Sequence, residues 1–97
     1  MPPKIMQTTA ECAGLALISE RFPEERETLQ RLFQKIPSFQ SFCADYRDCL
    51  SALKQWQEST SGEAPAMART YAELLQELEQ EVRQYLDDEI ASGAGRA

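Results

Sequence analysis

The chain contains no histidine, and this absence limits the chemistry that it can perform. Histidine is the commonest general base and metal ligand, and the Ser-His and Cys-His nucleophile pairs depend on it. The three cysteines, Cys12, Cys43 and Cys49, lack the C-x-x-C spacing of a zinc site. The four glycines do not form a phosphate-binding loop. The sequence therefore predicts no catalytic residue, no metal and no cofactor.

A row of carboxylates is the remaining feature that could do chemistry. Glu73, Glu77 and Glu81 recur every four residues and share one helix face. Catalytic carboxylate pairs need burial to separate their pKa values, and hard cations need oxygens from a loop or from several elements. The glutamines and arginine around this row indicate a solvated face instead. We therefore predict that the protein is not an enzyme.

The cysteines indicate a reducing compartment. Cys43 and Cys49 are six residues apart, which places them about 120° apart around one helix, so they cannot form a disulfide with each other. The odd number of cysteines and the lack of a targeting segment predict reduced thiols and a cytoplasmic location. No stretch approaches the ~20 apolar residues of a membrane span, so we expect no membrane partner.

Aromatic residues offer a better candidate site than the carboxylates. Tyrosine, tryptophan and arginine concentrate binding energy at protein interfaces. The candidate partner-binding residues are Tyr46, Arg47, Trp56, Tyr71 and Tyr85. The alternative is that these aromatic rings are core packing, with a hydroxyl group reaching the surface.

Two apolar stripes must position these residues. In residues 39–58 and 65–89, large apolar side chains recur at spacings of three and four, as on one face of a helix. The segment between them is polar and contains Gly62 and Pro65, so the two helices should return antiparallel. If the numbers of facing residues add up to about 124, Leu53 meets Tyr71, and Cys49 lies opposite Leu74 and Leu75. The stripes predict an antiparallel helical hairpin.

Shorter helices are expected before the hairpin. One is predicted over residues 9–20, although Gly14 costs about 1 kcal/mol against alanine inside a helix. Another is predicted over residues 23–36, with Pro37 ending it and Ser38 capping the next helix. We expect a sharp turn there rather than one kinked rod, because antiparallel packing buries the apolar face of this helix. The inward-facing residues are Leu29, Leu32, Phe33 and Ile36.

The predicted fold class is all-α: a helical hairpin with one or two shorter N-terminal helices, forming a three- to four-helix bundle. Residues 9–90 are predicted to form a single helical domain, residues 1–8 a flexible leader and residues 91–97 a flexible tail. Residues 63–90 carry eight acidic and two basic side chains, which accounts for the net charge of −6 of the whole chain. Such a surface repels the nucleic acid backbone, so we expect no nucleic acid partner.

These features predict a small non-enzymatic protein–protein interaction module, an adaptor, regulator or assembly factor that acts through a helical face. Its partner would be another protein. The alternative is an enzyme subunit or small-molecule binder with a pocket between the bundle helices, lined by the tyrosines and Trp56.

Self-association is a further expectation, because 97 residues are few to cover two long apolar stripes. A homodimer would pack hairpin against hairpin. We predict that the dimer interface consists of apolar residues that the single chain leaves uncovered, namely Phe39, Cys43, Leu74, Val82 and Leu86. The alternative is that the helix at residues 9–20 covers the same strip and leaves a monomer.

Overall fold

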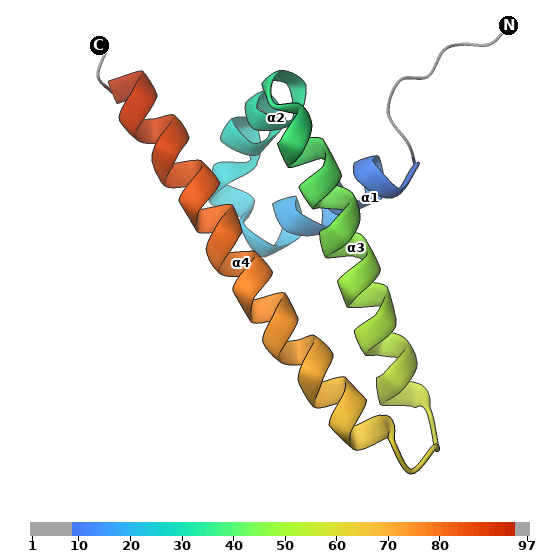
Figure 1. The fold of residues 1–97 in the computed structure, drawn as a ribbon. Helices are drawn as coiled ribbons and strands as arrows, with labels where there is room; N and C mark the ends of the chain where they lie inside the picture. Colours follow the sequence, from blue (N-terminus) through green and yellow to red (C-terminus); the bar gives the residue numbers. More distant parts are fainter. Residues whose placement is uncertain (1–8, 95–97) are drawn as a thin grey trace, which may run out of the picture. The chain divides into compact units, whose positions relative to one another are not determined.

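The computed structural model describes residues 9–94, and this part of the chain is helical without a strand (Figure 1). The all-α fold, a small helical bundle with a helical hairpin, is confirmed. Residues 1–8 of the predicted leader and residues 95–97 of the predicted tail lie outside the described part. The elements in order are α1 (Thr9–Arg21), the 3-10 helix η1 (Pro23–Glu25), α2 (Arg26–Lys35), α3 (Pro37–Glu58) and α4 (Ala64–Ala94).

The chain divides into two compact units, Met1–Arg47 and Asp48–Ala97, with the boundary inside α3. The single domain predicted for residues 9–90 stays a prediction. Within residues 9–94, no helix combines the length and the apolar character that crossing a membrane requires.

In the first unit, α1 and α3 touch backbone to backbone. A Cβ atom added to Gly14 would overlap the carbonyl oxygen of Cys43 and lie 2.5 Å from its carbonyl carbon. Glycine therefore lets the two helices approach more closely than any other residue would. Ile18, one turn after Gly14, is completely buried. The glycine that weakens α1 as an isolated helix is what allows α1 to pack.

The predicted helix at residues 23–36 is two elements, η1 and α2. Phe22 has φ −126° and ψ 66°, outside the helical region, as expected for a residue before proline. Glu25 follows with φ −105° and ψ 15°, so the first turn winds as a 3-10 helix and α2 begins at Arg26. The inward face was predicted correctly for Leu29, Leu32 and Phe33, which are buried, whereas Ile36 is half-buried.

The junction between α2 and α3 differs from the prediction, and Ser38 lies inside α3 rather than capping it. Pro37 does not separate two helices, because α3 begins at Pro37 itself and the break is the single extended residue Ile36, with φ −119° and ψ 104°. Proline suits a first helical turn, since it lacks an N–H group that would find no partner there. The Gln40 side-chain amide donates a 2.6 Å hydrogen bond to the Phe33 carbonyl, which ties the start of α3 to the end of α2. Figure 1 shows the chain changing direction sharply at this point.

In the second unit, the last part of α3 and α4 form the antiparallel hairpin (Figure 1). Two serines organise the loop at residues 59–63. The Ser59 hydroxyl accepts a 3.1 Å hydrogen bond from the Ser61 N–H group, and the Ser61 hydroxyl accepts one of 3.2 Å from Glu63. The helix that follows, α4, runs to Ala94 and so passes both its predicted end at residue 89 and the start of the predicted tail.

One contact tests the predicted register of the hairpin. The Cys49 thiol donates a 3.5 Å hydrogen bond to the Tyr71 carbonyl. Helix carbonyls point toward the C-terminal end of their helix, so this oxygen lies between the levels of Tyr71 and Leu75. The contact agrees with the predicted facing of Cys49 and Leu74 or Leu75 to within about one helical turn. Leu53 is buried, whereas Leu78 is half-buried.

Candidate protein-binding surface

The predicted partner-binding residues are divided between the two units. Tyr46 is only 2% exposed, so its ring is core, and Arg47, also in the first unit, is half-buried. Trp56, Tyr71 and Tyr85 lie in the second unit, on the hairpin, and all three are half-buried. Burial removes Tyr46 from the surface, and a binding role for the other four residues stays a prediction.

Most of the residues predicted for self-association are already buried in the single chain. Phe39, Cys43 and Val82 have no exposed area, and Leu86 is 1% exposed. Leu74 is the exception, because 40% of it is exposed. A second copy could therefore reach only Leu74 among these five without unfolding part of the chain, and the homodimer itself stays a prediction.

Leu74 belongs to a strip of apolar side chains along α4. Met67, Leu74, Leu78 and Tyr85 are spaced by seven, four and seven residues, which places them on one face of a helix. The other three members are half-buried. The sequence contained a signal for this strip. The apolar stripe of α4 is wider than the surface that one partner helix of a hairpin can cover.

Trp56 lies on the same side of the hairpin as this strip. The seam of the hairpin is the line along which α3 and α4 face each other. Buried Cys49 and Leu53 lie at the seam on α3, and buried Ala64 lies at the seam on α4. In a pair of antiparallel right-handed helices, two side chains lie on the same side of the pair when both are rotated from the seam in the same direction about their own helix axes. Four side chains are rotated from the seam in one common direction, by about 40° to 80°. They are Trp56 on α3 and Met67, Leu74 and Leu78 on α4. We call these four residues the Leu74 face.

Charges are distributed unevenly around the Leu74 face. Glu77 and Glu81 follow Leu74 and Leu78 by three residues each, so they flank the strip on α4, and both are exposed. Asp48, also exposed, lies on the outer part of α3 toward this side. The cationic residues of described residues 48–94 are rotated the other way from the seam, toward the back of the hairpin. They are Lys54, Arg69 and Arg83.

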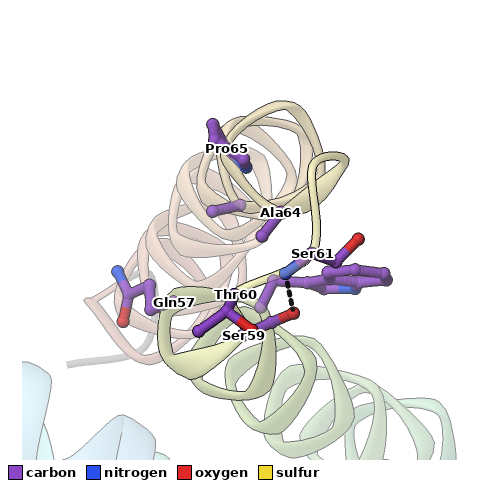
Figure 2. Close-up of a pocket in the computed structure, with 8 residues that line it drawn as sticks. Gln57, Ser59, Thr60, Ser61, Ala64 and Pro65 are labelled. Atoms are coloured by element: carbon purple, nitrogen blue, oxygen red, sulfur yellow. Dashed lines mark hydrogen bonds between the residues drawn. The ribbon is translucent and has the colours of Figure 1, made fainter.

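A hollow of about 420 Å³ lies at the tip of the hairpin (Figure 2). Figure 2 shows the loop hydroxyl groups beside it, with the hydrogen bond between Ser59 and Ser61. None of the lining side chains is an acid, a base or a thiol, so the hollow offers only hydroxyl, amide and indole groups and apolar surface. The lining residues are Trp56, Gln57, Ser59, Thr60, Ser61, Ala64, Pro65 and Ala68.

A second hollow, of about 340 Å³, lies in the first unit between α1 and α2. Cys12, Glu20 and Arg26 are its thiol, acidic and basic lining groups, and all three are exposed. The hollow at the hairpin tip has Trp56 but no tyrosine in its lining, and the hollow between α1 and α2 has neither. The alternative of a small-molecule binder stays a prediction.

The buried thiols are poor nucleophiles. Desolvation by burial, with the nearby charges of Glu11 and Cys12, raises the pKa of Cys43 to about 12. Burial also raises the pKa of Cys49. All three cysteines are free. Among the described residues, no three histidine, cysteine or acidic side chains gather closely enough to hold a metal ion.

Comparison with known proteins adds no relative. No protein-family model, curated protein or solved structure matches the chain. The feature of the chain that bears on function is therefore the surface of the hairpin, an apolar face with one exposed leucine and an acidic border.

Proposed function

We propose that the protein is a non-enzymatic interaction module, an adaptor, regulator or assembly factor, that binds another protein through the Leu74 face. The exposure of Leu74 is the observation that carries this proposal. Among the described residues, Leu74 and Ile90 are the only exposed large apolar side chains, and Ile90 lies on the other side of α4. A single exposed leucine is ordinary on a protein surface. Leu74, however, continues a row of half-buried apolar neighbours.

The Leu74 face has the composition of an interface. Leucine and methionine side chains at helical spacing are the anchors that a groove or a second helix receives. Trp56 at the loop end supplies a large aromatic group of the kind that dominates binding energy. Because Trp56, Met67 and Leu78 are already half-buried, they lose less side-chain freedom on binding than fully exposed groups would.

The cysteines support a cytoplasmic site of action. All three are free, and Cys12 is exposed at the surface. Exposed thiols persist where glutathione and thioredoxin keep them reduced. We therefore place the proposed interaction in the cytoplasm.

Photo-crosslinking from the proposed face tests this function. A benzophenone amino acid replaces Leu74 in one variant and Asp87 in a second, and both are expressed in the source cell. Asp87 is exposed on α4 and is rotated toward the back of the hairpin, so it is a matched control. Irradiation followed by mass spectrometry identifies the proteins captured at each position.

We expect one protein to be captured from position 74 and not from position 87. The Leu74→Ser substitution should reduce its co-purification with the chain, because it removes the exposed anchor while leaving the buried residues unchanged. Capture of the same proteins with equal yield from both positions would refute the proposed function.

A further inference from the structure

We infer that the partner segment of the Leu74 face is a basic amphipathic helix: a helix with one apolar stripe and lysine or arginine beside it. This inference rests on the proposed function and adds the chemistry of the partner. Its first support is the acidic border. A helix that places its apolar stripe on Leu74 and Leu78 would bring its flanking side chains close to Glu77 and Glu81. Cations at those positions would pair with the carboxylates.

The arrangement of charge on the hairpin gives the second support. The three cationic residues of described residues 48–94 all lie toward the back of the hairpin, whereas Glu77, Glu81 and Asp48 border the Leu74 face. A partner arriving at this side therefore meets negative charge around an apolar centre. Complementary charge of this kind increases the association rate and discriminates against acidic partners.

A second copy of the chain is a poor occupant of the same face. Each copy would bring its own Glu77 and Glu81 toward those of the other, and the chain carries a net charge of −6. Like charges placed together at an interface oppose association. An anionic membrane surface would be repelled for the same reason.

The dimensions of the face suit one helix. Met67 and Leu78 are eleven residues apart, a distance of roughly 16 Å along the axis at 1.5 Å per residue. About three helical turns of a partner would cover this length. Trp56, at the loop end, would contact one end of such a helix.

Tryptophan fluorescence can measure the binding directly, because Trp56 is the only tryptophan of the chain. The probes are two synthetic helical peptides without tryptophan that share one leucine stripe. One carries lysine and the other glutamate at every remaining position. We expect the lysine peptide to shift the Trp56 emission to shorter wavelength, with an affinity that falls as salt is added. The glutamate peptide should leave the emission unchanged.

Charge-matched variants separate this face from the general acidity of the chain. The double variant Glu77→Gln/Glu81→Gln removes the charges of the acidic border, and Glu58→Gln/Asp87→Asn removes the same charge from the exposed back of the hairpin. We expect roughly a two- to fivefold loss of affinity for each border carboxylate, and a much smaller loss for the control. Leu74→Ser should weaken binding on the order of tenfold. Circular dichroism should show the same helicity in all of them, since every substituted residue is exposed.

Equal losses of affinity for the lysine peptide in the two double variants would overturn the inference, because the attraction between peptide and protein would then not depend on Glu77 and Glu81. Equal binding of both peptides, still weakened by Leu74→Ser, would overturn it while leaving the proposed function intact. Failure of the lysine peptide to bind would also overturn it, and crosslinking from position 74 would then decide the proposed function separately. A dimer in sedimentation equilibrium that Leu74→Ser dissociates would show that a second copy occupies the face.

Discussion

Replacing Gly14 with alanine should destabilise the protein, although alanine is the better helix former. Intrinsic propensity alone predicts a gain of about 1 kcal/mol for this substitution inside a helix. The added Cβ atom, however, would overlap the Cys43 carbonyl oxygen and lie 2.5 Å from its carbonyl carbon, where ordinary contacts are 3.4–4 Å. The obstacle is the backbone of α3, which cannot rotate away as a side chain could. Helix α1 must therefore move outward by about 1 Å or more.

The size of the effect follows from what this movement exposes. A gap of 0.5–1 Å forfeits about a quarter to a half of the dispersion energy of the atoms that it separates. Ile18 is completely buried one turn from Gly14, and full burial of such a side chain is worth about 1.5–3 kcal/mol. Overpacking of a tight site has a typical cost of about 1–3 kcal/mol. We expect a net loss of roughly 1–3 kcal/mol, a decrease in Tm of about 5–20 °C for a domain of this size.

Urea denaturation followed by circular dichroism measures this loss, and Gly62→Ala is its matched control. A Cβ atom at Gly62 would meet nothing within 4 Å, and no described glycine has a positive φ. The control should therefore leave the free energy of unfolding unchanged or raise it by up to about 1 kcal/mol. A Gly14→Ala protein as stable as the parent would refute the close approach of α1 and α3.

Three other predictions concern the core and the thiols. Leu53→Ala should reduce the free energy of unfolding by about 2–4 kcal/mol and Leu78→Ala by less than half as much, because Leu53 is 8% exposed and Leu78 is half-buried; equal losses in urea denaturation would contradict this. Iodoacetamide at pH 8 should alkylate exposed Cys12 well before buried Cys43, and peptide mass mapping that shows equal labelling would contradict it. Burial raises the pKa of Cys43 from 9.0 to about 12, so its contribution to stability is complete below pH 9 and is lost as the pH rises toward 12. The parent should therefore lose stability above pH 9 more steeply than Cys43→Ala, by at most about 1.4 kcal/mol per pH unit, and parallel curves would contradict this.

Local patterns in the sequence were sufficient to predict the helices. The apolar spacing in residues 39–58 and 65–89, with the polar break between them, predicts the hairpin. Pro23 and Pro37 each lie directly after the residue at which the helical backbone is interrupted. The buried face of α2 at Leu29, Leu32 and Phe33 was predicted for the same reason. These features depend on periodicity and on backbone restrictions that act within a few residues.

Tertiary structure alone decided which apolar residues remain accessible. Periodicity identifies the apolar face of a helix, but it does not say how much of that face the other helices cover. The sequence therefore grouped Leu74 with Val82 and Leu86, whereas Leu74 is 40% exposed and the other two are buried. Gly14 is a second case, because it stabilises the fold through a close contact with Cys43, which is far away in the sequence. Accessibility and close approach are properties of contacts between distant segments, so one helix at a time cannot specify them.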